Sequence, residues 1–218
     1  MSTIFRLDAS IRHDGSVTRA VADTLESTIS TELGDATVIR RDLGSNPIEG
    51  SLWASAAFAG HTPEEHRTQD QVAAMKAAAA LADEVVSADA LIFAVPMYNF
   101  GVSQHFKTWF DIVATDPRLS LGQSQIVGRP AFLVTARGGG YGAGTPREGW
   151  DHATGWMRRV LEDVWGVDLD VIETELTLAE VTPQMAELRE LAREQLAESH
   201  ETARQSGRSV TIKLRSAA

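Results

Sequence analysis

The 218-residue sequence contains no cysteine. Disulfides, thiolate metal sites and a cysteine nucleophile are therefore excluded. A chain without disulfides suits a reducing compartment. The N-terminal stretch MSTIFRLDAS also lacks the long apolar segment of a secretory signal. On these grounds we expect a cytoplasmic protein.

Long apolar runs and excess positive charge are also missing. No stretch approaches the roughly 18 apolar residues that a membrane-spanning helix requires. The formal net charge is −10, and an acidic chain repels nucleic acid and anionic lipid, so we expect neither as a partner. The sequence shows no repeat and no low-complexity linker, and its length suits one domain with a substantial core. We expect a single domain over residues 1–218.

Strand-like and helix-like segments alternate along the chain. Apolar or alternating patterns predict strands at 3–9, 36–43, 90–96, 130–136 and within 167–179. Helical periodicity predicts helices over 17–33, 70–86, 102–113, 150–164 and from 183 to about 206. Strands separated by helices favour a parallel sheet, because parallel neighbours need a crossover connection. The tail 207–218 fits either a frayed end or a short added strand.

The connection after the first strand reads SIRHDGSVTRAV. In such sheets ligands bind beyond the carboxyl ends of the strands. Ser10, Gly15, Ser16 and Thr18 surround the start of the helix near Val17, where free N–H groups and the helix dipole suit a phosphate. Alternatively, Ser16 only caps the helix. The Walker pattern and GxGxxG are both missing, which disfavours a nucleoside triphosphate or a conventionally bound dinucleotide.

The connection after the third strand lies in VPMYNFGVSQHFKTWFD, residues 95–111. Met97 and Phe100 are suited to pack against a flat ring, and Asn99 offers both a donor and an acceptor to a heterocycle. The alternative is that these large side chains only cover the surface of the domain. Their position directly at a strand end favours the ring-binding interpretation.

The connection after the fourth strand reads TARGGGYGAGTPRE, residues 135–148. Its glycines allow the backbone to approach a ligand and present bare N–H groups, and Arg137 adds a planar cation. A flexible surface loop is the alternative. Taken together, the three connections predict a phosphate seat, a ring platform and a polar rim, which is what a mononucleotide with a large flat ring requires.

On these segments the sequence resembles the FMN-dependent azoreductases, also called FMN-dependent NADH:quinone oxidoreductases, of the flavodoxin-like superfamily. The resemblance extends over nearly the whole chain. It is carried by Ser10 with Ser16-Val17-Thr18, by PMYNFGVSQHFKTWFD, by TARGGGYG and by RRDLGSNPI at 40–48. It implies an α/β fold: a flavodoxin-like, doubly wound, five-stranded parallel sheet in the order 2-1-3-4-5 with helices on both faces.

The resemblance also implies a homodimer whose subunits each hold a tight, non-covalent FMN. Its phosphate would contact Ser10, Ser16, Val17 and Thr18. Its ring and ribityl chain would contact Met97, Tyr98, Asn99 and Phe100, and the polar edge of the ring would meet Ala136, Arg137, Gly138 and Gly139. Val17 and Ala136 depart from the polar residues frequent at those places, and each loses a possible hydrogen bond of about 1 kcal/mol.

The activity that the resemblance implies is a ping-pong, two-electron transfer from NADH or NADPH to a quinone or azo compound. Arg137 would stabilise negative charge on the reduced ring or the acceptor. No side chain need act as a nucleophile, so we expect no catalytic acid or base. We also expect no metal, since His61 and His66 are five residues apart rather than four. A flavodoxin-type electron carrier, a flavin-redox sensor module and a phosphoester hydrolase without flavin remain alternatives.

Two long connections complete the predictions. Residues 43–69 carry Trp53 and Phe58 in a loop that the core does not require, so we expect this loop to contact the partner subunit. Residues 114–129 are expected to form a lid over the acceptor pocket.

Overall fold

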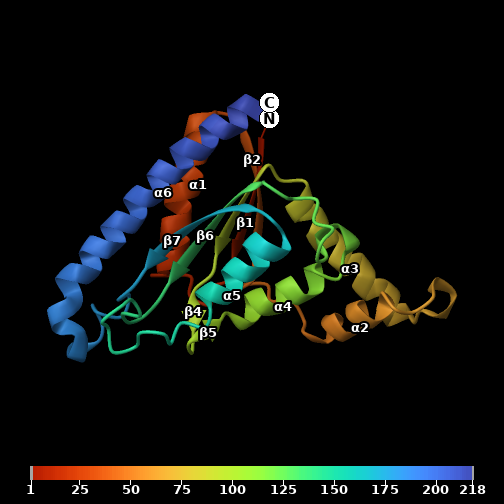
Figure 1. The fold of residues 1–218 in the computed structure, drawn as a ribbon, viewed down its shortest axis with the longest axis horizontal. Helices are drawn as coiled ribbons and strands as arrows, with labels where there is room; N and C mark the ends of the chain where they lie inside the picture. The colour runs from red at the N-terminus through yellow and green to blue at the C-terminus, as the bar shows by residue number, and fades with distance from the viewer. Residues whose placement is uncertain (1, 218) are drawn as a thin grey trace.

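The computed structural model describes residues 2–217 and contains one five-stranded parallel sheet (Figure 1). Its strands run in the order β2-β1-β3-β6-β7 and are β1 (Ser2–Asp8), β2 (Ala36–Asp42), β3 (Ala90–Ala94), β6 (Pro130–Ala136) and β7 (Asp168–Thr174). Counted as main strands, this order is 2-1-3-4-5. The predicted fold class, strand order and parallel pairing are therefore confirmed.

Helices cover both faces of this sheet, also as predicted. The α-helices are α1 (Val17–Leu33), α2 (Ser51–Ala59), α3 (Gln69–Val86), α4 (Gln104–Val113), α5 (Thr154–Arg158) and α6 (Arg189–Ala217). Short 3-10 helices lie at η1 (Glu64–His66), η2 (Pro117–Leu119) and η4 (Pro183–Leu188), and η3 (Arg159–Val164) continues α5 as a π-helix. Among residues 2–217, none of these helices combines the length and apolar character that crossing a bilayer demands.

Two apolar cores lie on the two faces of the sheet. One contains side chains of α3, α4 and α5, with Trp109 and Trp165 fully buried beside Phe93 of β3. The other contains α1 and α6 packed against the opposite side chains of the same strands. Because successive residues of a strand point to opposite faces, the central strand β3 is apolar throughout, and β6 is apolar except for the buried Thr135.

Helix α1 follows its sequence pattern closely. Val21, Leu25 and Ile29 are fully buried at four-residue spacing, as the periodicity predicts. The hydroxyl of Ser16 caps the first turn by accepting from the N–H of Arg19. Gly34 ends the helix in the left-handed conformation, at φ 74°. The capping role of Ser16 therefore exists whether or not a ligand binds.

Helix α6 corrects the prediction for the tail. It passes through Gly207 and continues to Ala217, so residues 207–217 form neither a frayed end nor a strand. Gly207 suggested a helix end, but here it allows α6 to lie against α1, as Figure 1 shows. A Cβ at Gly207 would lie 2.9 Å from both Cβ and Cγ2 of Thr28. Val210 and Leu214 beyond it are buried.

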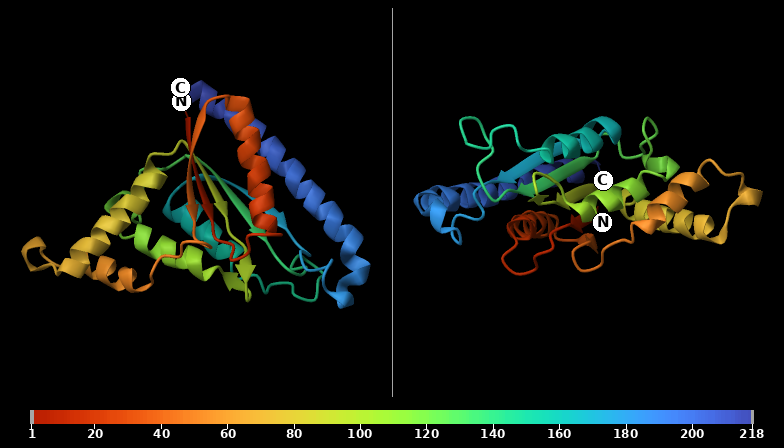
Figure 2. Two further views of the ribbon diagram at one scale, coloured as in Figure 1. Left: turned by 180° about the vertical axis from the view of Figure 1, so that it is seen from behind. Right: turned by 90° about the horizontal axis from the view of Figure 1, so that it is seen from below.

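The segment 43–69 is not a loop, because it contains α2 and η1. Together with the first turns of α3 it forms an arm that projects from the sheet in both views of Figure 2. Trp53 and Phe58 are 50% and 67% exposed on this arm. The periodicity that predicts the helix over 70–86 places Val72, Met75, Ala79 and Val85 on one apolar stripe, which is wrong in part. Val72 is exposed, and the buried residues of α3 are Ala74, Ala78, Leu81, Ala82 and Val85.

The predicted helix over 150–164 is shorter than expected. Trp150 lies outside α5 and is 51% exposed, whereas Met157 and Leu161 are buried.

Residues 114–129 are not a lid over a site at the strand ends. The segment joins α4 to the first residue of β6 and therefore lies at the amino edge of the sheet. There the N–H of Gly128 donates to the carbonyl of Gly166 at 2.7 Å. The hydroxyl of Ser124 donates to the backbone carbonyl of Trp165, also at 2.7 Å.

We expect Gly207→Val to separate α1 from α6 and lower the free energy of unfolding by about 1–3 kcal/mol, the usual cost of overpacking. Ser209→Val, on the exposed side of α6, is the matched control and should cost less than about 0.5 kcal/mol. Urea unfolding of both variants measures the difference. Equal stability of the two variants would show that the close contact with Thr28 contributes nothing.

Candidate functional site

The connections after β1, β3 and β6 meet at the carboxyl edge of the sheet, around two adjoining cavities of about 210 and 270 Å³. The two cavities share Met97, Tyr98, Gly138 and Leu178. Eleven of the twelve predicted residues line one cavity or both: Ser10, Ser16, Val17, Thr18, Met97, Tyr98, Asn99, Phe100, Ala136, Gly138 and Gly139. The structure therefore brings the three predicted connections together.

One end of the site is polar and lies at the start of α1. The hydroxyl-bearing residues Ser10, Ser16 and Thr18 are 2%, 7% and 1% exposed and all line the smaller cavity. Ser16 Oγ lies 3.3 Å from Thr18 Oγ1. The N–H groups of Val17 and Thr18 have no acceptor within the helix, because the first turn of an α-helix leaves its donors free. Buried hydroxyls beside free helical N–H groups make a suitable seat for an anion.

The other end is flanked by a hairpin that the sequence did not reveal. Strands β4 (Met97–Tyr98) and β5 (Gly101–Val102) pair antiparallel, with Asn99 and Phe100 in the turn between them. Both turn residues have left-handed backbones, at φ 49° and 66°. This conformation is uncommon for a residue with a bulky side chain and costs on the order of 1 kcal/mol or more.

Tyr98 connects the two ends of the site. Its hydroxyl lies 3.3 Å from Ser10 Oγ and accepts a hydrogen bond from the N–H of Ile11 at 3.1 Å. The hairpin and the loop after β1 are therefore held at a fixed spacing.

The glycine segment after β6 packs against the segment that follows β7. The N–H of Leu178 donates to the carbonyl of Gly138, and the N–H of Leu176 donates to that of Gly139, both at 3.2 Å. A Cβ at Gly138 would lie only 2.6 Å from Leu178 Cδ1. Gly138 is thus needed for a close approach, and the segment is anchored on one side rather than being free.

Arg137 is the predicted residue whose side chain lies elsewhere. It faces a neighbouring cavity of about 510 Å³ between β7 and α6. Its guanidinium is 8% exposed and pairs with Asp151 at 2.5 Å, Glu173 at 3.0 Å and Glu175 at 3.4 Å. Burial acts to lower the pKa of Arg137, but these carboxylates outweigh it and raise the pKa. Its charge is therefore already compensated.

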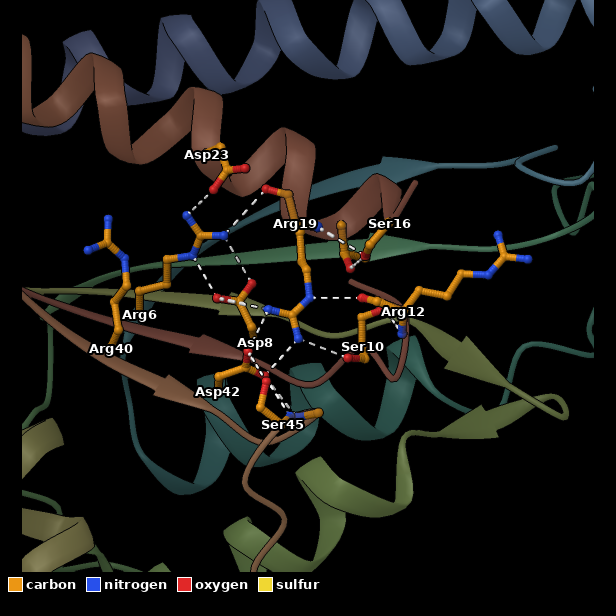
Figure 3. Close-up of polar contacts among 12 residues, drawn as sticks. Arg6, Asp8, Ser10, Arg12, Ser16, Arg19, Asp23, Arg40, Asp42 and Ser45 are labelled. Atoms are coloured by element: carbon orange, nitrogen blue, oxygen red, sulfur yellow. Dashed lines mark hydrogen bonds and ion pairs between the residues drawn. The ribbon is translucent and has the colours of Figure 1, made fainter. Parts of the chain in front are cut away.

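Arg19 of α1 fixes the loop after β1 in place (Figure 3). Its guanidinium binds both carboxylate oxygens of Asp42, at 2.7 and 3.1 Å. It also donates to the carbonyl of Ser10 at 2.9 Å and to that of Arg12 at 3.0 Å. Gly44 lies so close that a Cβ there would overlap the carbonyl oxygen of Ser10. This explains the RRDLGS pattern after β2: Asp42 holds Arg19, and Gly44 makes room for the loop.

The pKa of Asp42 reflects this arrangement. Partial burial acts to raise the pKa, but hydrogen bonds from Arg19 and Ser45 outweigh burial and hold the pKa well below its ordinary value of 3.8. The ionised form is thus favoured in the folded chain.

Several residues of the site were not predicted. Arg12, Pro96, Thr177 and Leu178 line the smaller cavity, and Tyr141 and Arg147 line the larger one. Arg12, Pro96, Tyr141 and Arg147 lie inside the segments quoted from the sequence, so their place in those segments could have identified them. Thr177 and Leu178 follow β7, and no pattern marked that connection.

Asp42→Asn should lower the free energy of unfolding at pH 7 by about 1–3 kcal/mol, because it weakens a partly buried, charge-assisted bond. The folded-state pKa of Asp42 is depressed, so its contribution is present above pH 3.8 and is lost as the pH falls toward the folded-state pKa. The difference between wild type and variant in urea unfolding should shrink below about pH 4.

Asp168→Asn is the control for this measurement. It breaks the exposed pair with Lys213 at 2.9 Å, which should be worth about 0–1 kcal/mol. The stabilising role of the Arg19–Asp42 pair would be contradicted if Asp42→Asn lowered the free energy of unfolding no more than the control does. It would also be contradicted if the loss stayed constant with pH.

Comparison with known proteins agrees with this geometry. Residues 2–199 match the model of a protein family described as having a flavodoxin-like fold. The chain is 36% identical over 205 residues to an FMN-dependent NADH:quinone oxidoreductase of Streptomyces avermitilis, covering 93% of this chain and 94% of that one. It is 35% identical over 192 residues to a protein of the same name from Frankia alni, covering 86% and 90%.

Solved structures show the same fold at lower identity. An azoreductase from Bacillus anthracis superposes with a TM-score of 0.76 at 18% identity, covering 95% of this chain and 99% of that one. An FMN-dependent NADH-azoreductase from Bacillus anthracis in complex with FMN gives 0.75 at 14% identity, covering 97% and 100%. By fold, by extent of match and by sequence identity, this chain belongs to the flavodoxin-like family of FMN-dependent NADH:quinone oxidoreductases and azoreductases.

Proposed function

We propose that this protein is an FMN-dependent oxidoreductase that uses NADH to reduce quinones. The observation that carries the proposal is the junction of an anion seat and a ring-sized cavity at one edge of the sheet. Ser16 and Thr18 lie at one end, and Asn99 and Gly138 lie at the other. The names of the relatives that are 35–36% identical support both the cofactor and the donor.

The residues present fit FMN. Its phosphate would lie at the buried hydroxyls of Ser10, Ser16 and Thr18, where the start of α1 supplies a positive field. The departure at Val17 is tolerable because only its backbone N–H is needed there. Met97 and Phe100 would flank the ring, and the Asn99 amide and the backbone of Gly138 and Gly139 would meet its polar edge. When bound, FMN would supply the two-electron redox chemistry, which protein side chains cannot perform.

This chain's own part is binding, orientation and exclusion of water. Tyr98 holds the hairpin at a fixed distance from the phosphate seat, and Leu178 covers Gly138. Preorganised contacts of this kind shorten the search for a reactive geometry. No side chain of the site is required as a nucleophile, acid or base.

Arg137 receives a different role from the one first expected. Its charge is engaged by three carboxylates, so we assign it to holding Asp151 and the β7 exit in place. Asp151 in turn accepts from the N–H groups of Ala153 and Thr154 at the start of α5. Only the backbone of Arg137, together with its neighbour Ala136, is then available to contact the ring at the edge of the site.

The donor and acceptor would enter one after the other, in a ping-pong cycle, because both would meet the same exposed side of the ring cavity. A quinone acceptor is supported by the relatives' names. We propose an azo compound as a second class of acceptor, because solved structures that share the fold are azoreductases. NADPH in place of NADH is a second option for the donor.

We further propose that the protein acts as a single-domain subunit of a cytoplasmic homodimer. The exposed Trp53 and Phe58 on the projecting arm support a partner surface, since isolated monomers seldom expose such side chains together. The cysteine-free composition suits the reducing cytoplasm.

The test of the function is to purify the protein, release its cofactor and follow NADH oxidation with menadione. We expect a yellow protein with FMN, and steady NADH oxidation without a partner protein. An electron carrier or sensor would bind FMN but would not sustain this turnover. A colourless protein that cannot be reconstituted with FMN would refute the proposal.

Two isosteric variants on α1 sharpen the test. Thr18→Val removes a hydroxyl that lines the phosphate end and should raise the Kd for FMN about two- to tenfold. Thr24→Val, two turns along, removes a hydroxyl that contacts His200 outside the cavity and should leave the Kd unchanged. Titration of apoprotein against FMN fluorescence measures both.

For the dimer, sedimentation should give twice the subunit mass at micromolar concentration. A Trp53→Asp, Phe58→Asp double variant should shift the mass toward the monomer, because charged side chains oppose burial of the patch. Val72→Asp, also exposed on the arm, tests whether the interface extends to α3. A wild-type chain that sediments as a monomer would exclude the homodimer.

A further inference from the structure

We infer that Arg147 forms a binding subsite for the anionic group of a flat ring substrate that approaches the exposed side of the larger cavity. The inference rests on the proposed function and identifies the residue that selects substrates there. The shared ligand chemistry is a phosphate, sulfonate or carboxylate attached to a ring compound. The two possible sources are the pyrophosphate of the hydride donor and an acid group of the acceptor.

The first observation is that the charge of Arg147 is unused. The sequence has 17 arginines, all inside the described residues. Fifteen of them have side chains that form ion pairs or hydrogen bonds to other groups, and within residues 2–217 only Arg12 and Arg147 show neither. Both line the site, one in each cavity.

The second observation is that Arg147 is held in place. Its guanidinium carbon lies 5.9 Å from the centre of the Tyr141 ring, within cation–π distance. Its Nη1 occupies the space where a Cβ of Gly139 would stand. Tyr141 is itself anchored, because its N–H donates to Glu175 Oε1 at 2.9 Å. The cation therefore lies against the glycine segment, at the exposed edge of the cavity.

The third observation concerns the neighbouring carboxylate. Glu148 follows Arg147 directly, but its Oε2 accepts from the N–H of Gly144 at 2.8 Å within its own turn. The guanidinium thus keeps its donors for a ligand. A planar group with several donors is well suited to grip an oxyanion at two points.

The cavity beside Arg147 is bordered by aromatic side chains suited to a flat ring. Phe100 meets Trp150 edge-on at 5.5 Å between centroids and Tyr141 at 6.4 Å. Phe100 and Tyr141 line the cavity and form an aromatic wall that suits a flat compound, and Trp150 packs against Phe100. The chain carries a net charge of −10, so an anionic substrate is repelled at long range. A free cation at the rim of the cavity reverses that repulsion locally.

The test compares wild type, Arg147→Ala, Arg147→Lys and Lys76→Ala. Lys76 lies on α3 and lines neither cavity, so its variant is the control for loss of one positive charge. NADH is combined with menadione, which is neutral, or with anthraquinone-2-sulfonate, which is anionic. Bound FMN is quantified in each preparation by absorbance, and wild-type turnover reports on the proposed function separately.

We expect Arg147→Ala to lower kcat/KM per bound FMN about tenfold for an anionic substrate and less than twofold for menadione. If kcat/KM for NADH falls with both acceptors, the subsite belongs to the donor. If only kcat/KM for anthraquinone-2-sulfonate falls, the subsite belongs to the acceptor. Arg147→Lys should recover part of the loss, and the variant without charge should lose part of the ionic-strength dependence. Lys76→Ala should behave as wild type.

Binding gives a readout that does not depend on turnover. The affinity for anthraquinone-2-sulfonate, measured by quenching of tryptophan fluorescence, should weaken about tenfold in Arg147→Ala, and Trp150 is the expected reporter because it packs against Phe100 of the cavity. The inference is overturned if Arg147→Ala changes neither the binding of the sulfonate nor any kcat/KM by more than twofold. It is also overturned if menadione loses as much as the anionic substrates.

Discussion

The site depends first on the pairing of Arg19 with Asp42. This bidentate pair joins the start of α1 to the end of β2, and the same guanidinium holds the carbonyls of Ser10 and Arg12. A loop that presents free N–H groups to an anion cannot use its own backbone to hold its shape. The donors of Arg19 therefore replace the backbone hydrogen bonds that a regular element would supply. Without them the loop after β1 would lose its fixed position beside the hairpin.

Each of the other two connections has a separate support. The hairpin is tied to the first loop by the hydroxyl of Tyr98, and its turn keeps two residues in left-handed conformations. The glycine segment is tied to the β7 exit by two backbone hydrogen bonds at Gly138 and Gly139. Because each connection is held by contacts within the chain, the cavity is largely formed before any ligand arrives, which reduces the ordering cost of binding.

The sequence predicts the position of the site better than the direction of its side chains. Parallel strands with crossover helices bring their carboxyl ends to one edge, so the three connections had to meet once the strands were recognised. Arg137 shows where this reasoning stops. Its neighbours Ala136 and Gly138 line the cavity, but its own side chain points to Asp151 and Glu173, because successive residues leave a strand on opposite sides. The partners of that side chain come from distant segments that no local pattern reveals.

Gly207 shows the same limit in a helix. Local propensity places a helix end at a glycine, whereas the structure uses the missing Cβ to bring α6 against α1. This contact lies outside the residues 2–199 that match the family model. It still bears on the site, because α1 packs against α6 on one face of the sheet and would carry the proposed phosphate seat at its first turn. The buried Val210 and Leu214 thus stabilise, from the far end of the helix, the element whose N-terminus the proposed cofactor would occupy.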